Sequence, residues 1–166
     1  MDNVIGVSMV GMFLAGLIFA VPLFASLGVI EPDRDYLMVY VAGSYWADTH
    51  EGRTANTYKA MDAGIHVYFK CHYAIIPHLG HWVDPRMTEL GYPERPNSFW
   101  YVLDNMVLYD ADIMLKISEQ GQSRGADAEE KLAQSLGIPV VYSLDDIPDN
   151  CPEGGFEEFY DGSGIG

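Results

Sequence analysis

The sequence predicts an α/β fold in which a parallel sheet of about four to five strands carries helices on both faces. Short apolar runs of strand length alternate along the chain with longer stretches whose apolar residues recur at helical spacing. The apolar runs are continuous, which is typical of strands that are buried on both faces of a parallel sheet. The stretches between them are long enough for the right-handed helical crossovers that parallel strands require.

Each element has its own signal in the sequence. The first apolar run ends at Gly43, and the first helical stretch places Ala55, Tyr58 and Ile65 at helical spacing. Ser98 is a suitable N-cap for the second helix, and residues 78–97 are expected to form the longest loop. In chain order, strands are expected at 37–42, 73–77, 111–117 and 138–142, and helices at 52–69, 98–109 and 126–136.

The chain is expected to have three parts. Residues 1–35 form a hydrophobic anchor and linker, residues 36–148 the α/β domain, and residues 149–166 an acidic, glycine-rich tail. The run 4–30 has no charged residue and exceeds the roughly 20 residues that cross a bilayer as a helix, so it is interpreted as a transmembrane helix. A cleaved signal peptide or a buried soluble helix are the alternatives.

Charge and cysteine content restrict location and partners. With 24 acidic against 9 basic residues the formal net charge is −15, which disfavours binding to a nucleic acid polymer. Arg34 follows the apolar run and no basic residue precedes it, so the domain is expected on the cytoplasmic side of the membrane. Cys71 and Cys151 lack a CxxC spacing and are expected to be ordinary reduced thiols, in agreement with that side.

Two acidic residues occupy positions where packing favours apolar side chains. Helical spacing puts Glu129 on one face with Leu132, Ala133 and Leu136, and Asp104 lies among apolar residues of the preceding helix. Apolar surroundings raise the cost of ionising a carboxyl group. The structural alternatives are that acids are common in a first helical turn and that Asp104 caps a backbone amide or pairs with Arg95.

Several motifs follow the order found in a known enzyme superfamily. They are Tyr-Val-Ala-Gly-Ser-Tyr at 40–45, Ile-Pro-His at 76–78, Asp104 before the third strand, Ser123-x-Gly125-x-x-x-Glu129, and Gly-Ile-Pro-Val at 137–140. Over residues 37–147 the chain resembles the nucleoside 2-deoxyribosyltransferase superfamily, which includes nucleoside monophosphate N-glycosidases and small-domain relatives. The resemblance implies a flavodoxin- or Rossmann-like sheet and sites near the contacts of a homo-oligomer.

The resemblance also implies roles for individual residues. Glu129 would attack the anomeric carbon of a nucleoside to form a glycosyl-enzyme, and Asp104 would assist the departing base. Ser123 would hold a 5′-phosphate, as in the nucleotide N-glycosidases, with Arg124 and Gly125 beside it. The remaining substrate-binding residues would be Gly43, Ser44, Tyr45 and His78. Whether transfer or hydrolysis completes the reaction stays open.

Other classes of function remain as alternatives. A non-catalytic module that binds or senses a nucleotide at the membrane would use the same cleft without needing the carboxylates. His72, His78 and His81 suggest a metal site, but the intervening strand separates them and the spacing lacks an HExxH helix. The expected protein therefore needs neither a metal nor an organic cofactor, and its ligand is a nucleoside or nucleotide.

Overall fold

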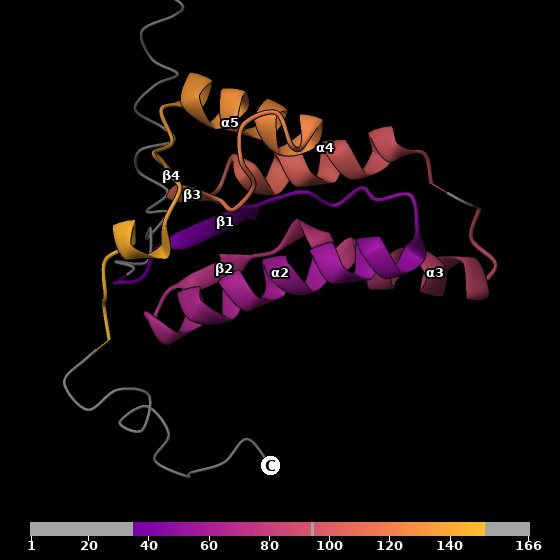
Figure 1. The fold of residues 1–166 in the computed structure, drawn as a ribbon, viewed down its shortest axis with the longest axis horizontal. Coiled ribbons are helices and arrows are strands. Elements are labelled where there is room, and N and C mark those ends of the chain that lie inside the picture. Colours follow the sequence, from indigo (N-terminus) through magenta and orange to yellow (C-terminus); the bar gives the residue numbers. More distant parts are fainter. Residues whose placement is uncertain (1–34, 94, 152–166) are drawn as a thin grey trace, which may run out of the picture. The chain divides into compact units, whose positions relative to one another are not determined.

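The computed structural model describes residues 35–93 and 95–151 and confirms the α/β class. A four-stranded parallel sheet has the order β2-β1-β3-β4 (Figure 1). Its strands are β1 (Met38–Ala42), β2 (Tyr73–Ile75), β3 (Ile113–Lys116) and β4 (Val140–Val141). The connection from β2 to β3 passes across β1, so the direction of winding reverses between β1 and β3.

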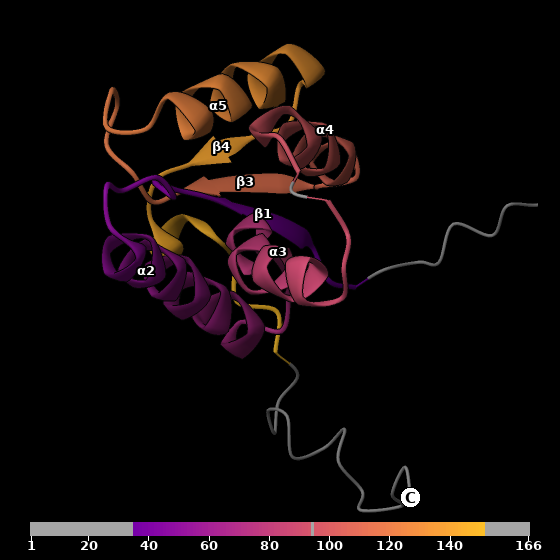
Figure 2. The same cartoon turned by 90° about the vertical axis from the view of Figure 1, so that its right-hand side faces the viewer.

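Helices cover both faces of the sheet. Helices α2 (His50–Phe69) and α3 (Gly80–Glu89) lie on one side, and α4 (Asn97–Leu108) and α5 (Arg124–Leu136) on the other (Figures 1 and 2). Two short 3₁₀ helices, η1 (Pro77–Leu79) and η2 (Leu144–Asp146), follow β2 and β4. Thr49 and Ser123 cap α2 and α5 with their side chains, and Gly137 ends α5 in the left-handed conformation that glycine adopts without strain.

The alternating side chains of β1 divide the core into two clusters. Val39 and Val41 pack with Ala60, Ala63 and Val67 of α2 on one face. Tyr40 and Ala42 point to the other face, where the buried partners are Leu108 of α4 and Ala126 and Ala133 of α5. Since successive strand residues face opposite sides of a sheet, the position of Tyr40 directs its ring toward α4 and α5.

Two local predictions were wrong. The segment expected as a long loop after β2 contains η1 and α3, and α3 accommodates Pro85 within the helix. His81 is buried on this helix and packs it against α2, so tertiary contacts outweigh the proline. Ser98 does not cap α4, because the helix begins at Asn97 and Pro96 occupies the N-cap position without a side-chain hydrogen bond.

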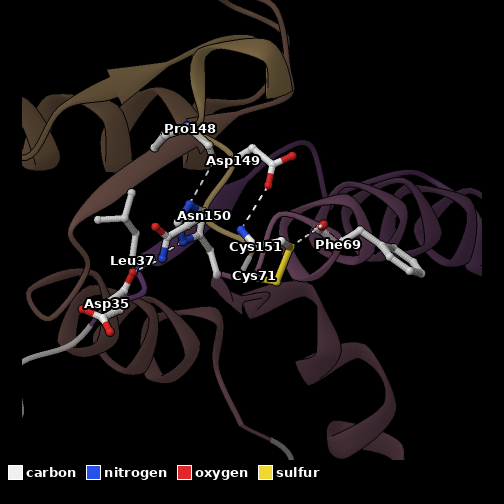
Figure 3. Close-up of a disulfide and its surroundings, with 9 residues drawn as sticks. Asp35, Leu37, Phe69, Cys71, Pro148, Asp149, Asn150 and Cys151 are labelled. Atoms are coloured by element: carbon white, nitrogen blue, oxygen red, sulfur yellow. Dashed lines mark hydrogen bonds between the residues drawn. A yellow bond between two sulfur atoms is a disulfide. The ribbon is translucent and has the colours of Figure 1, made fainter. Parts of the chain in front are cut away.

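The prediction of two free thiols was also wrong, because Cys71 and Cys151 form a disulfide across a sequence separation of 80 residues (Figure 3). The same region is joined by hydrogen bonds. The backbone N–H of Asn150 donates to the Lys70 carbonyl oxygen over 3.1 Å. His72 Nε2 donates to the Pro148 carbonyl oxygen over 3.0 Å, and His72 Nδ1 accepts from the Leu37 N–H. These contacts attach the chain to the domain as far as Cys151, three residues into the expected tail.

The proposed transmembrane segment at 4–30 and most of the acidic tail lie outside the described residues. Among the helices of 35–93 and 95–151, none has the length and apolar character needed to cross a membrane. Disulfides are typical of oxidising compartments, so the bond removes the thiol argument for a cytoplasmic domain and leaves only the charge bias around Arg34.

Candidate functional site

The carboxyl ends of β1 and β3 form the place where a doubly wound sheet binds its ligands. Backbone pairing continues there, since Ile117 N–H donates to the Ala42 carbonyl over 2.8 Å. Gly43 follows β1 at a very close approach, because a Cβ at this position would lie 2.8 Å from Ile117 Cγ1. A larger residue at the turn would therefore require the Ile117 side chain to move.

Tyr40 and Glu129 join β1 to α5 below this edge. The Tyr40 hydroxyl donates a hydrogen bond of 2.9 Å to Glu129 Oε1, and the tyrosine side chain is fully buried. Burial is the largest cause that raises the pKa of Tyr40, and the negative charges of Glu129 and Asp104 raise it further. The phenol therefore keeps its proton and acts as a donor to the carboxylate.

Asp104 of α4 belongs to the same cluster. Burial raises its pKa to about 6, and the pKa of Glu129 to about 7, where the charge of Asp104 adds to the effect of burial and the Tyr40 hydrogen bond opposes it. Among the described residues, Asp104 has neither a hydrogen bond nor a salt bridge, so the predicted alternatives of a cap or an Arg95 pair are not seen. Two half-buried carboxyl groups thus share a region without a compensating cation.

Glu130, the next residue of α5, faces a different environment. Its carboxylate lies 2.7 Å from Nζ of Lys116, and Asp127 lies 2.6 Å from the same ammonium group, whose side chain is fully buried in β3. Tyr142 donates a short hydrogen bond to Glu130, and Gln120 accepts from Lys116 over 3.1 Å. The lysine lowers the pKa values of both acids, and the three groups form a structural ion-pair cluster.

Ser123 has a structural role in the described fold. Its hydroxyl oxygen accepts from Ala126 N–H over 3.2 Å as the N-cap of α5 and lies 3.5 Å from the Gly43 carbonyl oxygen. Arg124 begins the helix and is exposed, while Gly125 faces Tyr101 of α4 at ordinary contact distance. The structure therefore brings Ser123 to the β1 turn as expected, but its hydroxyl is already engaged in capping.

His78 lies at the carboxyl end of β2, beside the Gly43 turn. Its Nε2 is 3.6 Å from the position of a Cβ on Gly43, and neither ring nitrogen has a hydrogen-bond partner among the described residues although the side chain is buried. Burial lowers the pKa of His78. The nearby backbone groups of Ser44 and Gly43 raise it in part, although neither has the geometry of a hydrogen bond to the ring. A buried neutral imidazole with unsatisfied nitrogens suits a ligand contact.

Tyr45 points away from the carboxylates. Its hydroxyl lies 3.0 Å from Nδ1 of His81, whose Nε2 lies 3.1 Å from the Thr54 hydroxyl. The tyrosine thereby links the turn after β1 to α2 and α3. The three histidines of the metal alternative do not converge, and no group of three potential metal ligands is found in the part of the chain that the structure describes.

Two hollows adjoin this edge of the sheet. The larger, about 450 Å³, lies beside the Lys116 cluster, where the ammonium group already has three acceptors. The smaller, about 320 Å³, lies between α2 and the turns after β1 and β3. Its lining residues are Ser44, Trp46, Asn56, Lys59, Ile117, Ser118 and Gln122. Glu129 and Asp104 line neither hollow, so the chemical argument for them rests on the hydrogen bond from Tyr40 to Glu129 and on the electrostatic effect of Asp104 on Glu129.

The sequence analysis did not identify Tyr40 and Lys116 as partners of the acidic residues, although the sequence contains a signal for each. A tyrosine inside the apolar strand Met38–Ala42 needs a partner for its hydroxyl when buried. A lysine within the buried strand Ile113–Lys116 likewise requires acids, and Asp127 and Glu130 are spaced to share one helix face.

No protein-family model matches the chain, and no curated protein matches it either. The resemblance to the nucleoside 2-deoxyribosyltransferase superfamily therefore stays an interpretation of motifs.

Proposed function

We propose that the protein cleaves the N-glycosidic bond of a nucleoside or nucleoside 5′-monophosphate, with Glu129 as nucleophile and Asp104 as proton donor. The observation that carries the proposal is that Glu129 accepts the hydrogen bond of the buried Tyr40 hydroxyl, while the charge of Asp104, from a separate helix, acts on both groups and no cation in the described part of the chain does. Structural acid clusters in proteins are normally neutralised, as Lys116 neutralises the neighbouring cluster. Perturbed pKa values in such a pair are typical of catalytic groups.

The chemistry requires one ionised and one protonated carboxyl group. In the first step, a Glu129 oxygen forms a bond to C1′ while the bond from C1′ to the base nitrogen breaks, and the proton of Asp104 passes to the departing base. In the second step, water or another base attacks C1′ and returns Glu129 as a carboxylate, with Asp104 accepting a proton. No oxidant, reductant or metal is consumed.

The electrostatics of the pair determines which carboxyl group holds the proton at a given pH. The two pKa values, about 6 and about 7, belong to coupled groups, so the pair holds a single proton mainly between these values. The Tyr40 hydrogen bond stabilises negative charge on Glu129, but burial still leaves Glu129 with the higher pKa, so the shared proton lies mainly on Glu129 and must pass to Asp104 before the reaction begins. Activity is accordingly expected to pass through a maximum near pH 6 to 7.

The decisive experiment compares the wild type with Glu129→Gln. Each is incubated with a panel of purine and pyrimidine nucleosides and their 5′-monophosphates, and free base is measured by chromatography. We expect base release by the wild type and a loss of at least ~10³-fold in the variant, because glutamine cannot form the glycosyl ester. Glutamine retains an acceptor for Tyr40, so the fold should be preserved, as circular dichroism would show.

Glu130→Gln is the matched control, since it changes the adjacent residue of the same helix but no group at the carboxylate pair. It should retain base release in its folded fraction. If the wild type binds nucleotides but releases no base, the protein is the non-catalytic sensor of the same fold, and the proposal fails.

Anchoring through residues 4–30, a cytoplasmic domain and assembly into homo-oligomers remain part of the proposal. The apolar composition of 4–30 supports the first. The charge bias around Arg34 supports the second, whereas the Cys71–Cys151 disulfide is typical of an oxidising compartment and opposes it. The third is supported by α4, which exposes apolar side chains on a helix of a soluble-type fold. These residues are Tyr101, Val102, Leu103, Met106 and Val107.

A further inference from the structure

We propose that the 320 Å³ hollow between α2 and the turns after β1 and β3 binds the phosphate group of the substrate, with Lys59 and Ser118 as its principal contacts. This inference rests on the proposed function for the identity of the whole ligand. It assigns the phosphate to residues other than Ser123, whose hydroxyl is engaged as the cap of α5.

Ser118 gives the first reason. Its Oγ is inaccessible to water and has no hydrogen-bond partner among the described residues, and the residue is only 8% exposed. Buried hydroxyl groups are nearly always hydrogen-bonded in folded proteins. Ser118 lines the hollow, so rotation of its side chain toward a ligand there would supply the missing partner.

The other polar groups of the hollow suit an anion. Ser44 contributes a second hydroxyl, Gln122 an amide, and Lys59 of α2 the positive charge. Glu119 accepts a hydrogen bond of 2.9 Å from the Gln122 side-chain amide. On a protein of net charge −15, an anion needs such a local cation to approach. A phosphate ester has three acceptor oxygens for donors that come from different directions.

The wall of the hollow is held in place by α2. The guanidinium group of Arg53 donates to the Ala47 carbonyl over 2.8 Å and lies 5.4 Å from the ring centroid of Trp46. Asn56 donates to the Tyr45 carbonyl oxygen over 3.2 Å. The turn after β1 is therefore fixed before any ligand binds, and a preformed site of about 320 Å³ lies at the lower end of the range for small molecules.

The hollow is connected to the start of α5 through the turn after β1. Ser44 follows Gly43, whose carbonyl oxygen contacts the Ser123 cap at the start of α5. Glu129 is six residues further along this helix, a rise of about 9 Å, and helical side chains tilt toward the helix N-terminus. A sugar phosphate with its phosphate in the hollow would have to pass over the carboxyl edge of the sheet, from the α2 side to the α5 side, to reach Glu129.

Calorimetric titration with ribose 5-phosphate, ribose and inorganic phosphate tests the inference without requiring catalysis. We expect ribose 5-phosphate to bind and ribose to show no detectable binding. Lys59→Ala should weaken ribose 5-phosphate binding about tenfold, and Ser118→Ala about fivefold, because each removes a contact to the anion. Lys131→Ala and Ser135→Ala, at exposed positions of α5 outside the hollow, are the matched controls and should bind as the wild type does.

Inorganic phosphate distinguishes the sources of the anion. Binding of inorganic phosphate with the same dependence on Lys59 would support a phosphate site open to the free ion, and binding of the ester alone would support a sugar-phosphate site. Equal affinity for ribose and ribose 5-phosphate, or equal effects of Lys59→Ala and Lys131→Ala, would overturn the inference. Base release measured separately on nucleosides tests the glycosidase proposal, so either idea can fail alone.

Discussion

Glu129 and Glu130 are neighbours on α5, and each accepts a hydrogen bond from a tyrosine, yet their ionisation is driven in opposite directions. Burial raises the pKa of Glu129 to about 7, with Asp104 as its only close charged neighbour in the described cluster. Lys116 lowers the pKa of Glu130 through an ion pair of 2.7 Å. Two adjacent residues of α5 therefore carry one carboxyl group with a pKa near neutral pH and one that Lys116 keeps ionised.

The difference shows how a single helix serves stability and chemistry together. Lys116 comes from β3 and satisfies Glu130 and Asp127, so this face of α5 is fixed to the sheet. The face that carries Glu129 meets Tyr40 and Asp104, which provide one donor and a second acid but no positive charge. The rigid ion-pair cluster holds the helix, and the uncompensated pair is free to exchange protons.

Lys116→Met should produce the largest change in stability. It leaves Glu130 and Asp127 close together without their cation, so we expect the free energy of unfolding at pH 7 to fall by roughly 3 kcal/mol. Urea unfolding followed by circular dichroism measures this. The loss should shrink as the pH is lowered, because protonated acids no longer need the lysine. A variant as stable as the wild type at pH 7 would contradict the structural role assigned to the cluster.

The contrast between the two faces was only partly predictable from the sequence. Apolar residues around Glu129 and Asp104 indicated that both acids lie against the core, and their convergence follows from the order of elements in a doubly wound sheet. The partner of Glu130 comes from a different element, and only the register of β3 against α5 identifies Lys116. Glu130 is in fact the more buried of the two glutamates, although helical spacing alone favoured Glu129.

The fold itself was predicted more completely than its covalent link. Continuous apolar runs predicted all four strands, because burial on both faces leaves a local pattern. The pairing of Cys71 with Cys151 leaves no such pattern, since it depends on where the chain passes after β4. The helix at Gly80–Glu89 was missed for the same reason: contacts of His81 with Tyr45 and Thr54 stabilise a segment that contains Pro85.

Glu129→Gln should alter the pH dependence of stability. The ordinary pKa of 4.5 applies in the unfolded chain and a pKa of about 7 in the fold, so the folded state binds more protons between these values. Wild-type stability should therefore fall as the pH rises from about 4.5 to about 7 and then stay constant. We expect the variant to lack a part of this fall on the order of 2 kcal/mol. Unfolding in urea at intervals across this range is the measurement.

Glu130→Gln should change the pH dependence of stability in the opposite direction. The folded-state pKa of Glu130 is lowered, so its contribution to stability is present above the unfolded pKa and is lost as the pH falls. This variant should be less stable than the wild type at pH 7 and approach it in acid. If both variants changed the pH profile in the same direction, the two glutamates would not occupy distinct electrostatic environments.

The two tyrosines permit the finest comparison. Tyr40→Phe removes the hydrogen bond that stabilises the Glu129 carboxylate, so the pKa of Glu129 should rise, and the limb near pH 7 in the pH profile for base release, which Glu129 sets, should move upward by about one pH unit. Tyr142→Phe removes the corresponding bond to Glu130 and should leave that limb in place. Carbon-13 NMR titration of labelled glutamate carboxyl groups follows both residues without relying on activity. A limb that moves equally in the two variants would show that Tyr40 acts through the fold as a whole, because only the bond to Glu129 distinguishes its position from that of Tyr142.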